Sequence, residues 1–212
     1  MADTRKLYDA ILTGDSKTAQ SAVREALAEG VAPFELVSKY MIPAMDEVGR
    51  LFECEEYFVP ELLLAGRAMK AALEIIRPLL ASSGVAPAGR VIIGTVRGDL
   101  HDIGKNLVAS MLEGAGFEVV DLGADVPPEK FIEAIRQKPV DIVGLSALLT
   151  VTMPAMKETI EALRQAGVRD SVKVMVGGAP VTQQYAHEIG ADGYSDNANG
   201  AVGVARHLVG TR

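Results

Sequence analysis

The sequence has one cysteine, Cys54, and no tryptophan in its 212 residues. A single cysteine excludes an internal disulfide framework and any zinc site built from several cysteines. No apolar run approaches the roughly 18 to 20 residues that span a bilayer, and the first residues lack the apolar core of a signal peptide. We therefore expect a cytoplasmic protein without a membrane partner.

Clusters of basic residues are missing as well. The formal net charge is −7, and no stretch gathers the lysines and arginines that would neutralise a row of phosphates. We therefore expect no nucleic-acid partner. Hydrophobic residues make up 49% of the sequence, which is typical of a normally packed globular chain with one large domain or two small ones.

The first part of the sequence has the periodicity of helices. Between about residues 4 and 82, apolar residues recur at intervals of three and four, and no alternating runs occur. Asp15 is a typical cap for the second helix, and Pro33 a typical start for the third. The predicted helices, which can bury their apolar faces together as a small bundle, are 4–13, 15–29, 34–53 and 59–81.

A linker follows the predicted helices. Residues 82–89 read Ser-Ser-Gly-Val-Ala-Pro-Ala-Gly, and such small residues with proline and glycine are typical of a connection between domains. We therefore predict a helical bundle domain at residues 1–84 and a second domain at residues 89–212.

The second part alternates short Val/Ile-rich runs with amphipathic segments, in the order βαβαβαβαβα. Continuous apolar strands separated by helices indicate a parallel sheet that is covered on both faces. The expected strands are 90–96, 117–121, 140–145, 172–177 and 192–195, and the expected helices are 104–115, 128–137, 153–166, 180–189 and 198–209. We predict an α/β, flavodoxin-like (Rossmann-like) five-stranded sheet of order 2-1-3-4-5, whose ligand crevice lies at the carboxyl ends of strands 1 and 3.

Polar side chains gather at this predicted crevice. Asp99 and His101 lie on the loop after strand 1, and Ser146, Thr150 and Thr152 lie on the loop after strand 3. A metal-binding imidazole usually donates its second ring N–H to a carboxylate, a carbonyl or water. Asp99, two residues before His101, is a candidate for that partner.

Two glycines end strand 4 at the same edge. Gly177 and Gly178 offer backbone without side chains, which lets a flat, bulky ligand approach closely. The same pair is also consistent with a simple turn from strand to helix.

Other site patterns fit poorly. The segment Gly98–Asn106 is not a phosphate-binding P-loop, because five residues separate its glycines and Asn106 stands where Ser or Thr is needed. A receiver domain needs an aspartate at the end of strand 3, where this chain has Leu145 and Ser146. The nucleophile elbow of hydrolases is also absent from the sequence.

Three motifs together resemble the signature of cobalamin-binding domains. They are Asp99-x-His101-x-x-Gly104, Ser146-x-Leu148 about 40 residues later, and Gly177-Gly178. In the first part, Met45–Gly49 and Tyr57–Leu62 are similar to the helical cap of the same family. The chain thus resembles the corrinoid proteins of bacterial and archaeal methyltransferase systems, and the cap and B12-binding domains of methionine synthase.

The resemblance implies a role for each of these residues. His101 would bind cobalt from below, Asp99 would hydrogen-bond the other ring nitrogen, and Thr152 would extend this relay. The further cofactor-binding residues are those beside the histidine, those lining a slot for the nucleotide tail, and those of the cap: Asp102, Ile103, Gly104, Ser146, Leu148, Thr150, Gly177, Gly178, Phe58 and Leu62. Ordinary packing within the bundle remains an alternative for Phe58 and Leu62.

The implied cofactor is cobalamin, as methylcobalamin or another corrinoid. The implied function is a methyl carrier that shuttles between a substrate-specific methyltransferase and an acceptor methyltransferase. The chain by itself would not catalyse turnover, and a reductive activator would be a further partner. The length leaves no room for a barrel of roughly 250 residues to bind the methyl donor, so methanol, methylamine, betaine and methoxylated aromatics all stay open. The alternatives are the cobalamin-binding subunit of a mutase and a cobalamin-dependent sensor.

Overall fold

The structure is a computed structural model that describes residues 4–83 and 86–210. The chain divides into two compact units at residues 86 and 87, and residues 113–116 group with the first unit. The predicted boundary at residues 84 to 89 stays a prediction, because residues 84–85 of the predicted linker lie outside the described residues.

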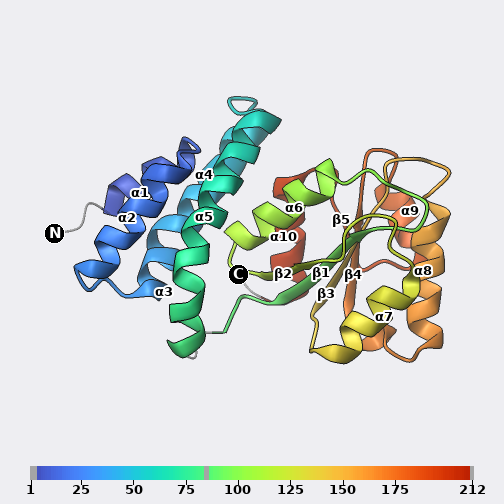
Figure 1. Cartoon of the computed structure of the whole chain (residues 1–212). Helices are drawn as coiled ribbons and strands as arrows, with labels where there is room; N and C mark the ends of the chain where they lie inside the picture. The colour runs from blue at the N-terminus through green and yellow to red at the C-terminus, as the bar shows by residue number, and fades with distance from the viewer. Residues whose placement is uncertain (1–3, 84–85, 211–212) are drawn as a thin grey trace. The chain divides into compact units, whose positions relative to one another are not determined.

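The described part of the first unit is helical, as its periodicity predicts (Figure 1). The side chain of Asp15 caps the second helix by accepting from the N–H groups of Lys17 and Thr18, at 3.1 and 3.0 Å. The helices are α1 (Thr4–Leu12), α2 (Ser16–Ala28), α3 (Pro33–Leu36), the π-helical segment η1 (Val37–Met41), α4 (Ile42–Glu53) and α5 (Val59–Ser83).

The predicted single helix at 34–53 contains a π-helical interruption. The N–H of Ile42 donates to the carbonyl of Val37, five residues earlier, instead of four. Pro43 follows directly and has no N–H to donate to the preceding turn, so the helix widens here rather than breaking.

The second unit contains the predicted sheet. All its strands pair in parallel, in the order β2-β1-β3-β4-β5, which confirms the flavodoxin-like prediction. Its strands are β1 (Arg90–Thr95), β2 (Glu118–Asp121), β3 (Ile142–Ser146), β4 (Lys173–Gly177) and β5 (Gly193–Tyr194). Its helical segments are α6 (Ile103–Gly114), α7 (Pro128–Gln137), α8 (Pro154–Gln165), the 3-10 segment η2 (Arg169–Ser171), α9 (Gln183–Ile189) and α10 (Ala198–Leu208).

Helices cover both faces of this sheet. Figure 1 shows α7, α8 and α9 on one face and α6 and α10 on the other. The core on the first face joins strand residues such as Val143 and Val174 to Phe131, Ile160 and Ile189 of the three helices. These side chains are at most 4% exposed, so the sheet is a rigid platform for the loops at its carboxyl edge.

Several predicted boundaries differ from the structure by one to three residues. Helix α9 begins at Gln183 rather than at residue 180, because the Thr182 hydroxyl accepts the N–H of Tyr185 at 3.1 Å and caps the helix there. Helix α5 continues to Ser83, beyond the predicted start of the linker. Ser146 is the last residue of β3 rather than part of the loop after it.

Within the described ranges, each helix is too short or too polar to cross a lipid bilayer.

Candidate ligand site at the carboxyl edge of the sheet

The loop after β1 presents His101 with its ring held in place. The ring nitrogen Nδ1 lies 2.8 Å from Asp99 Oδ1, and the backbone N–H of His101 donates to the same oxygen at 3.0 Å. The Thr95 hydroxyl donates to the His101 carbonyl at 3.0 Å. The ring remains 49% exposed, so it is oriented by the protein and open to a ligand.

The second oxygen of Asp99 binds the loop after β3. Oδ2 accepts the N–H groups of Leu148 and Leu149 at 2.8 and 3.3 Å, and it accepts the Thr152 hydroxyl at 2.6 Å. The Asp99 side chain is fully buried, and Thr152 is 7% exposed. One carboxylate therefore joins the loops after β1 and β3, which are the two loops that flank the crevice of this sheet order.

The Asp99 carboxyl is held in its ionised form. Burial raises its pKa, but the hydrogen bonds from Thr152, from the amides of His101 and Leu148, and from the His101 ring outweigh that effect and hold the pKa well below its usual range. An ionised carboxylate only accepts hydrogen bonds, so Nδ1 of a neutral His101 carries the proton. The lone pair is then on Nε2, which is the arrangement that a metal-binding imidazole requires.

Large apolar side chains next to His101 in the sequence and on the loop after β3 are exposed. Leu100 is 75%, Ile103 72% and Val151 79% exposed, and Leu148 and Leu149 are more than 40% exposed. Exposed apolar residues gathered on two loops mark an interaction site. Ile103 and Leu148 were predicted from the sequence as site residues, whereas Leu100, Leu149 and Val151 were not, since exposure cannot be seen in the sequence.

The glycines at this edge differ in whether the surrounding structure has room for a side chain. Gly178 has φ +133°, and a Cβ there would overlap the carbonyl oxygen of Ala147. A Cβ at Gly177 would lie 3.2 Å from the carbonyl oxygen of Ser195, which is tight. A Cβ at Gly104 would meet nothing within 4 Å. The fold therefore requires glycine at position 178 and leaves position 104 free.

The other predicted residues of the second unit lie near the same edge. Ser146 is half-buried at the end of β3, where it pairs with Thr95 and Gly177 of the neighbouring strands. Thr150 is exposed on the loop after β3. Asp102 interacts with the first turns of α6, because its carboxylate accepts from Asn106 Nδ2 at 3.1 Å.

The two predicted residues of the first unit differ in exposure. Phe58 is 61% exposed, and its N–H donates to Glu61 Oε2 at 3.0 Å, which fixes the start of α5. Leu62 is fully buried. Burial favours the packing alternative for Leu62, and exposure leaves the side chain of Phe58 free for a contact.

Several polar groups that support these loops were not predicted from the sequence. Lys105 is only 2% exposed and forms an ion pair with Asp121 at the end of β2, while Asn106 Oδ1 accepts from its ammonium group at 2.7 Å. Asp125 contacts the loop after β1. Asp125 lies two residues after Gly123 and two before Pro127, and an aspartate in such a segment after a strand is a weak signal for a loop contact.

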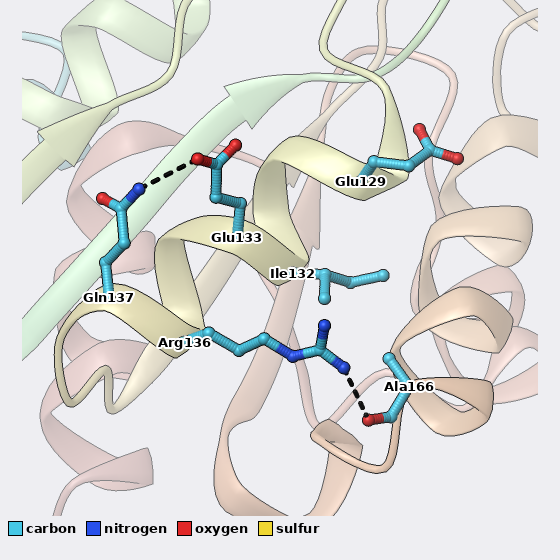
Figure 2. A pocket seen from close by; sticks show the side chains of 6 residues that line it. All are labelled: Glu129, Ile132, Glu133, Arg136, Gln137 and Ala166. Carbon is cyan, nitrogen blue, oxygen red and sulfur yellow. Dashed lines mark hydrogen bonds between the residues drawn. The ribbon is translucent and has the colours of Figure 1, made fainter.

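A shallow surface hollow lies apart from these residues. Figure 2 shows it along α7, with Arg136 Nη2 donating to the carbonyl of Ala166 at 3.4 Å and Gln137 Nε2 donating to Glu133 Oε1 at 3.0 Å. The hollow is lined by Glu129, Ile132, Glu133, Arg136, Gln137 and Ala166. It shares no residue with the edge that carries His101.

Fold and site together define a class of protein: a flavodoxin-like binding domain that offers a carboxylate-held histidine to a bulky ligand. The B12 binding domain family matches residues 89–203, and a second B12 binding domain family matches residues 4–77. The chain therefore belongs to the B12-binding corrinoid proteins.

Two relatives and two solved structures match nearly the whole chain. Trimethylamine corrinoid protein 2 of Methanosarcina mazei is 48% identical over 93% of this chain and 91% of its own length. Dimethylamine corrinoid protein 1 of Methanosarcina acetivorans is 43% identical over 97% of this chain and 96% of its own length. A cobalamin-binding protein of Desulfitobacterium hafniense matches with TM-score 0.79 and 34% identity over 98% of this chain and 99% of its own. The methanol:cobalamin methyltransferase complex MtaBC of Methanosarcina barkeri matches with TM-score 0.85 and 28% identity over 99% and 80%.

These similarities confirm the resemblance to corrinoid proteins of methyltransferase systems. They favour the methyl carrier over the mutase subunit and the sensor, because the relatives are methylamine corrinoid proteins and one solved match is a methyltransferase complex.

Proposed function

We propose that this chain is a corrinoid methyl carrier, which takes a methyl group from a substrate-specific methyltransferase and gives it to an acceptor methyltransferase. A bound corrinoid supplies the cobalt ion on which the methyl group travels. The observation that carries the proposal is the His101–Asp99–Thr152 relay, with the Nδ1 to Oδ1 distance of 2.8 Å and the Oγ1 to Oδ2 distance of 2.6 Å. The names of the relatives and of the MtaBC complex support it.

The residues of the second unit fit such a cofactor. A macrocycle provides the equatorial ligands of its metal, so one protein imidazole is enough, and His101 would be that ligand through Nε2. The exposed side chains of Leu100, Ile103, Leu148 and Val151 would lie against the apolar underside of the ring. Their exposure is unfavourable in water and is relieved when a flat apolar surface covers them.

The hydrogen bonds of Asp99 define what this relay does for the histidine. The carboxylate orients the ring through Nδ1–H and makes Nε2 a stronger donor to the metal, as carboxylate partners of metal-binding histidines do. Thr152 and the amides of Leu148 and Leu149 keep the carboxylate ionised and in place. Because metal ligation requires a neutral imidazole nitrogen, the Asp99–His101 pair would couple ligation of a bound metal to protonation.

The nucleotide tail of the cofactor needs a narrow path beside the sheet. We propose that Ser146, Leu148 and Thr150 line this path, and that Gly104, Gly177 and Gly178 keep it open. The open space around the Cα of Gly104 supports this, because the fold alone gives no reason for glycine there.

The helical part is proposed to be the cap of the cofactor, with domains at residues 1–84 and 89–212. The separate family matches at 4–77 and 89–203 support this division. Phe58, at 61% exposure, is the proposed contact of the cap with the cofactor, and Leu62 is retained as a weaker candidate because it is buried. Asp102 and Ile103 are the remaining proposed cofactor contacts.

The partners and the place of action are part of the same proposal. A substrate methyltransferase is supported by the MtaBC complex, and an acceptor methyltransferase and a reductive activator follow from the chemistry of carriage. Relatives named for dimethylamine and trimethylamine favour a methylated amine as the donor. We expect the chain to act in the cytoplasm.

Reconstitution tests the proposal. Apoprotein mixed with hydroxocobalamin and then desalted should keep the pigment and show the spectrum of base-off, histidine-ligated cobalamin. With the cofactor reduced, purified methyltransferases for methylamines or methanol should change the spectrum only when their own donor is present. Colourless protein, or pigment that keeps its own benzimidazole on cobalt, would falsify the assignment.

A matched pair of glycine substitutions tests the tail path. Gly178→Ala forces a side chain into φ +133° and against Ala147, and we expect a loss of about 2–4 kcal/mol of unfolding free energy. Gly104→Ala should leave this free energy unchanged or raise it by up to about 1 kcal/mol, because alanine favours a helix. Denaturant unfolding of the apoprotein measures both.

The same pair separates folding from binding. If the tail passes Gly104, Gly104→Ala should retain hydroxocobalamin at least several-fold less well than the wild type although it is equally stable. Equal retention by Gly104→Ala and wild type would remove Gly104 from the path.

A further inference from the structure

The loop after β2, residues 122–127, holds the loop that carries the histidine. Beyond the last pairing of β1 with β2, the N–H of Thr95 donates to the carbonyl of Gly123 at 3.0 Å, and the N–H of Val126 donates to the carbonyl of Thr95 at 2.9 Å. Val126 also forms an isolated parallel bridge with Val96. The two loops therefore leave the sheet side by side.

Asp125 is the residue of this loop with an unusual backbone. Its φ is +53°, and among the described residues only Glu55 shares a positive φ without being glycine. The left-handed region is unfavourable for side chains with a Cβ, and short polar residues occupy it when they form local hydrogen bonds. A non-glycine residue held there points to a specific contact that this conformation makes.

Asp125 hydrogen-bonds two consecutive residues of the loop after β1, the loop that carries His101. Its carboxylate Oδ1 accepts the N–H of Gly98 at 2.7 Å, and its own N–H donates to the carbonyl of Asp99 at 2.9 Å. Gly98 is itself left-handed, with φ +82°. One residue thus fixes the backbone on both sides of the Gly98–Asp99 peptide.

Asp99 is then fixed from two directions. Its carboxylate binds His101 and the loop after β3, while its backbone carbonyl binds Asp125 of the loop after β2. The exposed ion pair of Arg97 with Glu129, at 3.0 Å, joins the loop after β1 to the first turn of α7 and adds little, since exposed pairs contribute weakly. Rotation of the Gly98–Asp99 peptide would move Asp99 Oδ1 away from the ring nitrogen that it holds.

We propose that Asp125 is a positioning residue for the metal ligand: it fixes the backbone of Gly98 and Asp99 so that the carboxylate holds His101 in the orientation that ligates cobalt. This inference rests on the proposed function, in which His101 is the ligand. Asp125 acts only through Asp99 and needs no contact with the cofactor.

Three variants at position 125 divide its contributions. Asp125→Asn keeps an acceptor oxygen and tolerates a positive φ. Asp125→Gly relieves the backbone strain and removes the acceptor. Asp125→Ala removes the acceptor and keeps the strain. Asp170→Ala, in the exposed η2 segment far along the chain, is the matched loss of one surface aspartate.

The measurement is the electron paramagnetic resonance spectrum of the bound cobalt(II) corrinoid in protein labelled with ¹⁵N-histidine. A ¹⁵N ligand splits each cobalt line into two, whereas the ¹⁴N of benzimidazole splits it into three. We expect wild type, Asp125→Asn and Asp170→Ala to show the histidine pattern. In Asp125→Gly and Asp125→Ala, the fraction of cobalt(II) that shows the histidine pattern should fall by roughly threefold or more. Loss of a residue that bonds a metal ligand directly typically costs more, about 10- to 100-fold.

Each outcome is decisive. Full histidine splitting in Asp125→Gly would overturn the inference alone, because that variant folds without strain and lacks the acceptor. The inference is supported if Asp125→Asn keeps the histidine pattern and Asp125→Gly loses it. A general loss of stability would not depend on whether the side chain at position 125 has an acceptor oxygen. A wild-type spectrum without histidine splitting would overturn the proposed function and, with it, this inference.

Discussion

His101→Ala is expected to abolish the histidine-ligated spectrum of the bound corrinoid while leaving the fold intact. Removal of a residue that merely supports a metal ligand costs 10- to 100-fold, so loss of the ligand itself should lower methyl transfer by at least roughly 100-fold. The ring is 49% exposed, and its loss removes little buried surface. Unfolding free energy should change by less than about 1 kcal/mol.

The control is His187→Ala, which removes an exposed histidine from the last turn of α9. Spectra of both reconstituted variants, together with denaturant unfolding of their apoproteins, make the comparison. A His101→Ala protein with an unchanged cobalt spectrum would show that another residue, or the cofactor's own base, occupies the lower position.

Asp99→Ala is expected to be the most destabilising change at the site. It leaves the N–H groups of Leu148 and His101 without the buried carboxylate that accepts them, whereas the Thr152 hydroxyl keeps the Leu149 carbonyl as an acceptor at 2.8 Å. Unsatisfied buried donors cost about 1–3 kcal/mol each, and some will find water, so we expect a total loss of about 3 kcal/mol or more. Denaturant unfolding of the apoprotein measures it.

Asp99→Asn removes the negative charge of the side chain and keeps its size and shape. The amide keeps one acceptor oxygen but turns an NH₂ group toward groups that donate, so its unfolding free energy should lie between those of wild type and Asp99→Ala. The comparison of cofactor spectra should show weaker histidine ligation in the asparagine variant, because a neutral partner makes the imidazole a poorer ligand.

The same variant has a distinct pH dependence. The pKa of Asp99 is lower in the folded chain than in the unfolded one, so its stabilising contribution is complete above the ordinary aspartate pKa of about 3.9 and is lost as the pH falls toward the folded pKa. The stability gap between wild type and Asp99→Asn should therefore be constant from pH 7 to about 5 and shrink below about pH 4. A gap that is independent of pH down to pH 3 would contradict the assigned ionisation.

Much of this fold could be predicted from the sequence, because its signals are local. Val/Ile runs separated by amphipathic segments indicate the parallel sheet, and the position of Asp99 two residues before His101 indicates their pairing. The π-helical turn before Pro43 was not predicted, since a proline at that spacing can break, bend or widen a helix.

Other parts of the site leave no side-chain signal. Leu148 and Leu149 hold Asp99 through amide hydrogens, which nearly every residue has, and only the path of the loop brings them within 2.8 and 3.3 Å. The reach of Thr152 likewise depends on loop conformation, and so does the contact of Asp125 with Gly98. The sequence therefore indicates the ligand and its partner, whereas the outer supports become visible only in three dimensions.

The shared carboxylate of Asp99 has a consequence for protein engineering. Since one oxygen binds the histidine and the other binds the loop after β3, the conformations of the two loops depend on each other. A designer who transplants this histidine onto another flavodoxin-like scaffold must carry residues 95–104 and 147–152 together. The first segment grafted alone would bury the Asp99 carboxylate without its donors, and the second grafted alone would leave the Leu148 amide and the Thr152 hydroxyl without that carboxylate.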